Sequence, residues 1–419
     1  MDNNKINSIE NQTKCAFEHR HDIQALSSNE KNTLLHDIAA KIIDEIPSII
    51  TENTKDMDIA KTNNTPNSLL DRLLLTEERI VGIADSIRDI ASLPDPIGAI
   101  LDSWERPNGL SIKKVRVPLG CIGMIYEARP NVTADAIAIA IKTNNAIVLR
   151  GSASAYHSNL AITSVFKAMC SLSSINPDFI QLLEDVSREG VKTFVSLNQY
   201  LDLIIPRGGA SLIQNVIKSA TVPTIETGVG LCHLYIDEHA SLDIALDIAD
   251  NSKTHRPSVC NACETLLVHK NIAADFLPEI SKRFSEKNVE IKGCVKTQAY
   301  IKHASEATEE DWKTEYHGLT ISIKVVTSTE DAISHINQYG TLHTEAIVSN
   351  HQNTLDLFSK SIDASTIITN ASTRFTDGGE FGFGAEIGIS TQKLHARGPM
   401  GINELTSYKY IVEGSGQVR

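Results

Sequence analysis

Cys260 lies in a polar, proline-containing segment that could support nucleophilic chemistry. The segment reads Arg-Pro-Ser-Val-Cys-Asn-Ala-Cys-Glu-Thr and runs from Arg256 to Thr265. The thiolate is the reactive form of cysteine, and a helix N-terminus near a thiol lowers its pKa. Pro257 is compatible with the first turn of a helix or with the loop before one. These residues alone leave two interpretations of Cys260 open, a reactive thiol and an inert core cysteine.

Cys263 forms a C-x-x-C spacing with Cys260. One interpretation makes Cys263 a redox partner of Cys260, and the one we favour makes it a core neighbour. A structural zinc site needs a second such pair, or a histidine pair at ligand spacing, and the sequence offers neither. We therefore expect no metal site.

Four further groups follow predicted strands, where α/β enzymes often bind ligands. Gly208 and Gly209 open a helix, so they indicate either a phosphate contact or a tight turn. Arg150 could hold a 2′-phosphate, or it is a solvated arginine at the end of a strand. Asn131 is either an ordinary N-cap or a donor to an oxyanion. Arg374, in a glycine-rich loop, could hold a carboxylate, or it is an exposed surface residue.

The elements that must position these groups alternate between strands and helices after residue 112. We predict strands over 112–117, 122–126, 146–149, 201–205, 234–236, 265–268, 321–326, 346–348, 366–369 and 408–412. We predict helices over 134–142, 157–170, 211–219, 242–248, 273–284, 330–336 and 353–362. The first hundred residues are predicted to be helical, with a capping box at Ser27-x-x-Glu30 and an isoleucine stripe at 80, 83, 87 and 90. Repeated β-α-β units imply parallel sheets covered by helices on both faces.

Length and composition narrow the class of protein. A chain of 419 residues is expected to form two or three domains. The net charge of −13 disfavours nucleic acid as a partner. Seven scattered cysteines fit a reducing compartment rather than a disulfide framework. A polar N-terminus and the lack of an apolar run of about 20 residues argue against a membrane protein, so we expect a cytoplasmic one.

Taken in chain order, these motifs resemble those of the γ-glutamyl phosphate reductases (glutamate-5-semialdehyde dehydrogenases), a family of the aldehyde dehydrogenase superfamily. The resemblance covers most of the chain after about residue 112. The matching stretches are VPLGCIGMIYEARPNVTADA (117–136), NNAIVLRGSASAYHSNLA (144–161), IIPRGGASLI (204–213), ATVPTIETGVGLCHLYID (220–237), KTHRPSVCNACETLLVH (253–269), HTEAIVSN (343–350) and NASTRFTDGGEFGFGAEIGISTQKLHARGPMGINELTSYKYIV (370–412).

The resemblance implies a reaction and a role for each candidate residue. NADPH would reduce γ-glutamyl phosphate to glutamate 5-semialdehyde with release of phosphate, in proline synthesis. Cys260 would form a thioacyl intermediate, and Asn131 with the Cys260 backbone N–H would hold the oxyanion. Arg150 would meet the adenosine ribose or its 2′-phosphate, and Glu315 the nicotinamide ribose. Glu226 stands where oxidative members carry the general base, and we group it with the cofactor-binding residues.

The resemblance also implies an architecture of two Rossmann-like parallel-sheet domains with a small β oligomerisation flap. The cofactor domain would comprise 1–103 and 120–250, and the catalytic domain 251–400. The flap would comprise 104–119 and 401–419, and would build a homodimer or homotetramer. A separate glutamate 5-kinase is the expected transient partner, because the acyl phosphate is labile.

Two departures from the family pattern border the expected cofactor site. The family has Ser-Gly-Asn where this chain has Thr143-Asn144-Asn145, and Gly-Gly-Ser-Glu where this chain has 151–154.

Two other functions remain open from the sequence. One is a different enzyme of the superfamily, which oxidises an aldehyde or reduces another acyl phosphate. The other is a non-catalytic binding protein that kept the fold. The presence of Cys260, Asn131 and Glu315 argues against the second.

Overall fold

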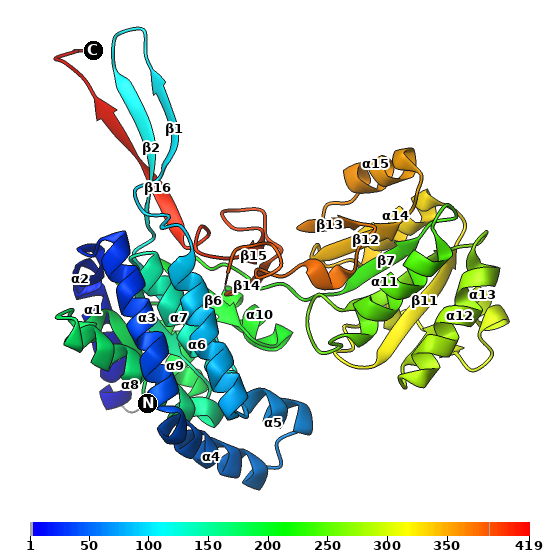
Figure 1. Cartoon of the computed structure of the whole chain (residues 1–419), viewed down its shortest axis with the longest axis horizontal. Coiled ribbons are helices and arrows are strands. Elements are labelled where there is room, and N and C mark those ends of the chain that lie inside the picture. Colours follow the sequence, from blue (N-terminus) through cyan, green and yellow to red (C-terminus); the bar gives the residue numbers. More distant parts are fainter. Residues whose placement is uncertain (1–2, 385) are drawn as a thin grey trace. The chain divides into compact units, whose positions relative to one another are not determined.

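The computed structural model describes residues 3–384 and 386–419, which form two compact units (Figure 1). The first unit comprises 1–227, 382–388 and 400–419, and the second comprises 228–381 and 389–399. Each unit is described by itself.

The first unit contains a parallel sheet, a helical layer and a separate antiparallel sheet. Its helices are α1 (Asn3–Glu18), α2 (Arg20–Gln24), α3 (Ser28–Asp44), α4 (Ile46–Thr62), α5 (Asn67–Leu73), α6 (Glu77–Ser92), α7 (Pro130–Lys142), η1 (Ala153–Ala155), α8 (Tyr156–Leu172), η2 (Pro177–Phe179), α9 (Arg188–Phe194) and α10 (Ala210–Ser219). Its strands are β1 (Ile100–Glu105), β2 (Ser111–Pro118), β3 (Cys121–Tyr126), β4 (Ala146–Arg150), β5 (Ile180–Leu182), β6 (Leu203–Arg207) and β16 (Thr406–Glu413).

The N-terminal helices form as the sequence predicts. Ser27 caps α3, and the capping box with Glu30 is complete, because each side chain bonds the other residue's backbone N–H. The isoleucine stripe of α6 is buried, and α6 packs against α3 and α7. Helices α1, α7, α8 and α10 contact the parallel sheet, whose order is β5-β4-β3-β6 and whose pairings are all parallel. Every residue of β3 and β4 is buried, as expected for strands covered on both faces.

The family departure at Thr143-Asn144-Asn145 keeps its backbone shape. Asn144 has a φ of 56°, in the left-handed region that glycine and asparagine adopt most readily. Its side-chain oxygen accepts a hydrogen bond from the buried Lys31 ammonium at 2.8 Å. The Asn145 amide donates to the Leu405 carbonyl at 2.8 Å. Asn144 therefore has a backbone conformation that glycine also adopts readily.

Three antiparallel strands in the order β1-β2-β16 form a narrow sheet that extends from the first unit (Figure 1). We call this sheet the flap. The sequence predicts β2 and β16 but not β1, whose six residues are all exposed and show no buried face. Arg116 ties β2 to the start of β16, because it donates to the Asn403 carbonyl at 2.9 Å and to the Thr406 hydroxyl at 2.6 Å. The flap thus begins at Ile100, slightly before the predicted boundary at 104.

The second unit is built on a parallel sheet in the order β10-β9-β11-β8-β7-β12-β13. Its strands are β7 (Cys232–Ile236), β8 (Cys263–His269), β9 (Glu290–Gly293), β10 (Ser305–Glu306), β11 (Thr320–Val326), β12 (Thr344–Val348) and β13 (Thr366–Thr369). Its helices are α11 (Leu242–Thr254), α12 (Ala273–Glu286), α13 (Val295–Tyr300), η3 (Asp311–Lys313), α14 (Thr329–Tyr339), α15 (Gln352–Ser361) and η4 (Thr373–Phe375). The short strands β14 (Gly388–Ser390) and β15 (Gly398–Met400) pair with each other.

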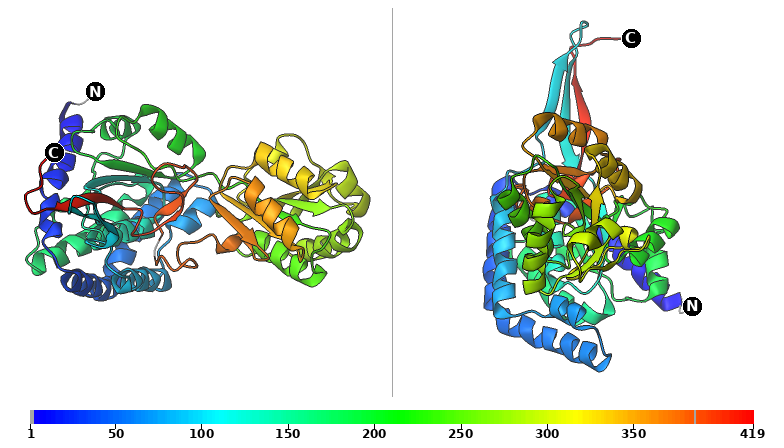
Figure 2. Two further views of the ribbon diagram at one scale, coloured as in Figure 1. Left: turned by 90° about the horizontal axis from the view of Figure 1, so that it is seen from above. Right: turned by 90° about the vertical axis from the view of Figure 1, so that its right-hand side faces the viewer.

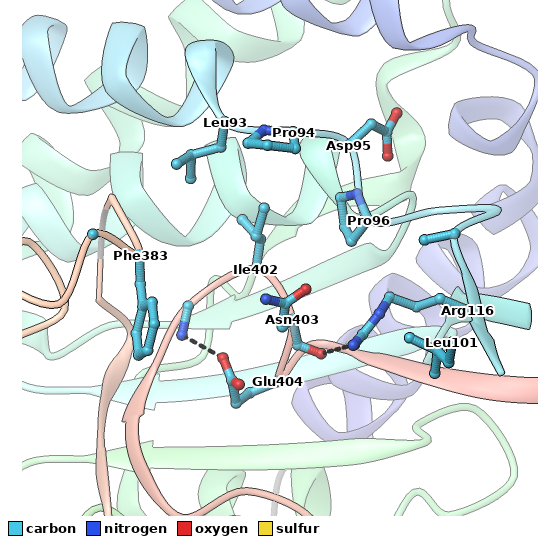
Figure 3. Close-up of a pocket in the computed structure, with 13 residues that line it drawn as sticks. Leu93, Pro94, Asp95, Pro96, Leu101, Arg116, Phe383, Ile402, Asn403 and Glu404 are labelled. Atoms are coloured by element: carbon cyan, nitrogen blue, oxygen red, sulfur yellow. Dashed lines mark hydrogen bonds between the residues drawn. The ribbon is translucent and has the colours of Figure 1, made fainter.

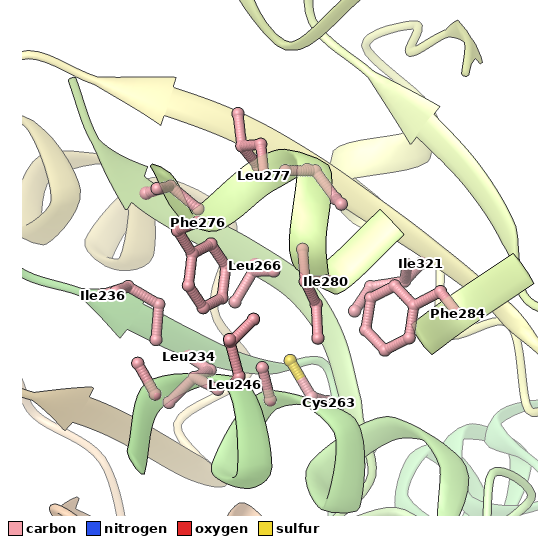
Figure 4. Packing of buried hydrophobic residues seen from close by; sticks show 14 of the residues in the cluster. Leu234, Ile236, Leu246, Cys263, Leu266, Phe276, Leu277, Ile280, Phe284 and Ile321 are labelled. Carbon is pink, nitrogen blue, oxygen red and sulfur yellow. The ribbon is translucent and has the colours of Figure 1, made fainter. Parts of the chain in front are cut away.

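Alternate residues of the strands face two separate apolar cores, and helices cover both faces of the sheet (Figure 2). On one face, Leu266 of β8 packs with Phe276 and Ile280 of α12 (Figure 4). On the other face, Leu267 packs with Phe358 of α15. The period of two along a strand therefore places successive side chains in opposite cores.

The division between the units lies after residue 227, whereas we expected it at 250. The reason is β7, which pairs with β8 on one side and β12 on the other. A β-α-β pattern does not reveal which sheet a strand joins, so the sequence does not assign β7 and α11 to the second unit.

Candidate active site

Cys260 lies in the loop between α11 and β8, three residues before β8 begins. The residues around it form turns and no helix, so of the two contexts expected for Pro257 the structure shows the loop. No helix N-terminus at this position is available to lower the pKa of the thiol. The Cys260 side chain is half-buried.

The backbone of Cys260 packs tightly against the segment that leads into β7. A Cβ atom on Gly230 would lie 1.7 Å from the Cys260 carbonyl oxygen, so only glycine fits there. The Cys232 thiol donates to the same carbonyl oxygen, with an Sγ–O distance of 3.1 Å. Gly230 and Cys232, which belong to one segment, therefore both contact the carbonyl oxygen of the candidate nucleophile.

Glu315 lies in the loop before β11 and also contacts the segment that leads into β7. Its Oε1 accepts the Gly230 N–H at 3.0 Å, and its Oε2 lies 3.2 Å from the His317 Nε2. Its side chain is only 10% exposed. Glu315 is thus linked to Cys260 through Gly230.

A buried ion pair supports the Glu315 loop. The Lys253 ammonium lies 2.5 Å from Glu264 Oε2, and both side chains are fully buried. The other oxygen of Glu264 accepts the His317 N–H at 3.3 Å. Burial raises the pKa of Glu264 to about 7, against the opposing effect of Lys253. Removing either partner would leave a buried charge, which is expected to destabilise this loop strongly.

Arg374, in η4, lies close to the Cys260 loop. The Asn261 side-chain amide donates to the Arg374 carbonyl at 3.4 Å and to the Thr376 carbonyl at 2.8 Å. Burial lowers the pKa of Arg374, which the Asp377 carboxylate opposes. The Arg374 Nε is buried without a hydrogen-bond partner. The guanidinium can therefore accept a further anionic partner next to the thiol.

Five predicted residues lie in the first unit, at or after the carboxyl ends of its strands. Asn131 is not an N-cap, because α7 begins one residue earlier, at Pro130. Its amide donates to Asp135 at 3.4 Å. Glu226 is half-buried in the segment that follows β6 and α10.

Arg150 and the Gly208-Gly209 turn are already engaged by protein groups. The Arg150 Nη2 donates to the Val186 and Ser187 carbonyls, while its Nε is buried without a partner. Burial lowers the pKa of Arg150. The Gly209 N–H, at the start of α10, donates to Glu127 Oε2 at 2.9 Å.

Cys263 is a core residue. It is fully buried in the apolar cluster drawn in Figure 4, which also contains Leu266 and Ile280. Its thiol contacts the Thr265 carbonyl at 3.4 Å, and burial raises its pKa to about 12. These observations support the core interpretation over that of a redox partner.

Sequence reasoning missed Gly230 and Cys232. Cys232 contacts His343 Nδ1 at 3.6 Å as well as the Cys260 carbonyl. The available signal was Gly230-Leu231-Cys232, a glycine and a cysteine shortly before the strand predicted at 234–236. That signal does not say which loop the strand end would touch.

One group of metal-ligating side chains occurs among the described residues. Cys15, His19 and Asp178 lie within 4.8 Å of one another, in the first unit. Burial and the Asp178 charge raise the pKa of the Cys15 thiol, so it stays protonated, and Asp178 faces Lys167 at 3.9 Å. We assign no metal to this group.

A pocket of about 290 Å³ lies at the base of the flap in the first unit (Figure 3). Leu93, Phe383 and Ile402 supply apolar walls. Its polar groups are largely paired, with Gly401 N–H donating to Glu404 at 2.8 Å and Arg116 donating to the Asn403 carbonyl. None of the predicted site residues lines this pocket, so we do not identify it as the active site.

Along the described part of the chain, no helix combines the length and the apolar character that crossing a membrane requires.

Comparisons with known proteins identify the family of this chain. The model of the aldehyde dehydrogenase family matches residues 7–298. A gamma-glutamyl phosphate reductase of Clostridium perfringens is 52% identical over 406 residues, which are 97% of this chain and 98% of that protein. One from Caldicellulosiruptor bescii is 52% identical over 418 residues, which are 99% of this chain and 100% of that protein.

A crystal structure gives the same result for the fold. The gamma-glutamyl phosphate reductase of Thermotoga maritima has a TM-score of 0.95 and 44% identity to this chain, with 98% of this chain and 100% of that one covered. The predicted α/β architecture of the superfamily is therefore confirmed. The chain belongs to the aldehyde dehydrogenase family and, within it, to the γ-glutamyl phosphate reductases.

Proposed function

We propose that this protein reduces L-γ-glutamyl 5-phosphate to L-glutamate 5-semialdehyde and phosphate, with NADPH, in proline biosynthesis. The observation that carries the proposal is the arrangement of Cys260, Glu315 and Arg374 in one unit, in a chain that belongs to this family. A half-buried thiol with a half-buried guanidinium nearby suits a substrate that is anionic.

In the proposed first step, the Cys260 thiolate attacks the γ-carbonyl carbon. The carbon–oxygen bond to phosphate then breaks, phosphate leaves with the electron pair, and a thioester remains on Cys260. Asn131 and the Cys260 backbone N–H are the proposed donors to the oxyanion of this step. Arg374 is the proposed partner of a substrate carboxylate or phosphate, and Arg374→Lys should raise the KM for substrate because it loses the bidentate geometry.

The carboxyl edge of the first sheet has groups that fit a nicotinamide dinucleotide. The unpartnered Nε of Arg150 leaves its guanidinium able to receive an anion, which supports a contact with the 2′-phosphate. Gly208 and Gly209 are the second candidate, although a phosphate there would have to displace Glu127. When bound, the cofactor supplies the hydride that reduces the thioester carbon.

The remaining steps belong to this chain's own residues. After reduction the carbon–sulfur bond breaks, which returns the electron pair to Cys260 and releases the semialdehyde. The balance is one acyl phosphate, one NADPH and one proton for one aldehyde, one NADP⁺ and one phosphate. No water is activated in this direction, so Glu226 has a positional role near the cofactor.

The proposal also concerns the oligomeric state of the protein. Ile100, Trp104, Tyr408 and Tyr410 on the flap are exposed, which indicates a surface that another copy covers. We propose a homodimer or homotetramer built through the flap. Trp104→Lys with Tyr410→Lys should then yield a monomer in size-exclusion chromatography with light scattering, and an unchanged mass would contradict this.

Two further parts of the proposal concern the cell. A cytoplasmic location suits the seven free cysteines of the chain, and fractionation of cells would test it.

Transient association with a glutamate 5-kinase would shorten the free lifetime of the acyl phosphate. Failure to cross-link the two proteins at high concentration would count against the association.

The function itself is tested in the reverse direction. Purified protein should reduce NADP⁺ in the presence of glutamate 5-semialdehyde only when phosphate is added. Turnover without phosphate would instead favour the alternative, an aldehyde-oxidising enzyme. Use of other acyl phosphates at equal efficiency would contradict the substrate assignment, and equal efficiency with NADH would contradict the cofactor preference.

A further inference from the structure

Cys232 is a fully buried thiol directly behind the candidate nucleophile. It is the first residue of β7, and its side chain is 0% exposed. Its S–H group donates to the Cys260 carbonyl oxygen at 3.1 Å, which is short for a hydrogen bond to sulfur. None of the proposed chemical steps uses this thiol.

The thiol is held in its protonated, donating form. Burial raises the pKa of Cys232 well above its usual value, and the Glu345 and Cys260 charges add to this effect. The neighbouring His343, 3.6 Å away through Nδ1, is neutral, because burial lowers its pKa to about 4. The S–H therefore persists as a donor over the pH range in which the protein would work.

Gly230 also restricts the position of the Cys260 carbonyl. Gly230 lies against the same oxygen so closely that a Cβ atom there would overlap it. The Gly230 N–H is in turn fixed by Glu315 at 3.0 Å. Because the peptide unit is planar, fixing the direction of this carbonyl restricts ψ at Cys260, and with it the direction of the Cys260 side chain.

We propose that Cys232 is a positioning residue, whose S–H group orients the nucleophile by holding the Cys260 carbonyl. This inference rests on the proposed function and names a further residue of the same site. The hydrogen bond directs the negative end of the peptide dipole into the protein, away from the oxyanion that forms at the substrate. Without the donor, the Cys260 loop would sample directions in which the thiolate does not meet the substrate carbon.

The chain offers a matched control. Cys263 pairs with Cys232 across β7 and β8 and is equally buried. Its thiol contacts the Thr265 carbonyl, not that of Cys260. Cys263→Val therefore changes packing in the same sheet without removing the donor to the nucleophile.

The test compares Cys232→Val, Cys232→Ser and Cys263→Val in the full-length protein. The first readout is the rate of Cys260 alkylation by iodoacetamide across a pH series, followed by peptide mass spectrometry. Peptide mapping is needed because Cys294 is another half-buried thiol. Although burial raises the pKa of Cys294, hydrogen bonds with Thr297 and nearby backbone amides lower it overall. The second readout is kcat and KM for the phosphate-dependent reaction, and the third is the thermal unfolding midpoint.

We expect Cys232→Val to lower both kcat and the alkylation rate about three- to tenfold, the effect of one net hydrogen bond, with little change in KM. Cys232→Ser keeps a donor and should recover much of both rates. Cys263→Val should change neither rate, even if it unfolds at a lower temperature.

Equal rates for Cys232→Val and Cys263→Val at matched stability would overturn the proposal, as would a Cys232→Ser variant no better than valine. Alkylation requires no substrate, so it remains informative if the wild-type protein lacks phosphate-dependent turnover. In that case the proposed function fails, while a slow Cys232→Val alkylation would still support the positioning role.

Discussion

The two parallel sheets of this protein place their candidate groups at opposite edges. In the first unit, Glu127, Arg150 and Gly208 each follow a strand, so they lie at the carboxyl edge. In the second unit, Cys260 and Glu315 each precede a strand, so they lie at the amino edge. Arg374 follows β13, but its loop returns to the amino edge, where Thr344 at the start of β12 donates to the Thr376 hydroxyl at 3.0 Å.

The two edges of a parallel sheet provide different chemical groups to a ligand. Helices begin at the carboxyl edge of a parallel sheet, and their free N–H groups favour anions such as phosphate. Loops at the amino edge follow helix C-terminal ends, so α11 offers Cys260 no such N–H groups. At that edge the thiol depends on side chains, and Arg374 is one cation that the structure brings near it.

The largest expected effect comes from removing Cys260, the candidate nucleophile at the amino edge of the second sheet. Cys260→Ala should lower kcat by at least about 10³-fold, because the covalent route is lost. Binding of NADPH, measured by fluorescence titration, should stay within about twofold, because the Cys260 side chain is not among its proposed contacts. Cys263→Ala is the control for losing a neighbouring thiol. Surviving turnover in Cys260→Ala would exclude the thioester mechanism.

A second change separates two roles for Glu315. Glu315→Ala removes the acceptor of the Gly230 N–H, and losing a charged hydrogen bond should reduce kcat about 10- to 100-fold. Cys260 alkylation should slow in parallel, and Glu315→Gln, which keeps an oxygen, should lose less. If alkylation is unchanged while the KM for NADPH rises, Glu315 acts on the cofactor ribose and not on the Cys260 loop.

A third change addresses the carboxyl edge of the first sheet. Arg150→Met should raise the KM for NADPH about tenfold, with a smaller rise for NADH, because only NADPH carries the 2′-phosphate. Turnover at saturating cofactor should be almost unchanged. The variant also loses bonds to two backbone carbonyls, so its unfolding midpoint is measured alongside. Equal effects on the two cofactors would show that Arg150 is structural only.

The smallest effect concerns pH and the amino edge of the second sheet. Burial lowers the pKa of His343 from 6.5 to about 4, so between these values the unfolded chain binds a proton that the folded chain does not. This contribution to stability is complete above pH 6.5 and is lost as the pH falls towards 4. His343→Gln should therefore flatten the pH dependence by roughly 1 kcal/mol per pH unit in this window. Urea unfolding at several pH values measures it, with the exposed His351→Gln as control. Parallel curves for wild type and His343→Gln would contradict the assignment.

Most regular elements could be predicted from local patterns. The capping box of α3, the isoleucine stripe of α6 and the strand–helix alternation after residue 112 all reflect neighbouring residues. Elements without an apolar period escaped prediction, and β1 is the clearest case, because all its side chains are exposed. The interpretation of Asn131 as an N-cap differs from the structure by two positions, because the N-cap is Arg129 and α7 begins with Pro130.

The sequence by itself determined the identity of the nucleophile candidate, the family and the two-sheet architecture, because the motifs around Cys260 and Arg374 are specific and local. Only the tertiary structure decided that β7 joins the second sheet, and that Gly230 and Cys232 meet the Cys260 carbonyl. Strand pairing and loop contact join segments about 30 residues apart, and their geometry depends on how whole sheets are assembled. No spacing along the chain encodes that contact, so the sequence does not indicate a role for Cys232.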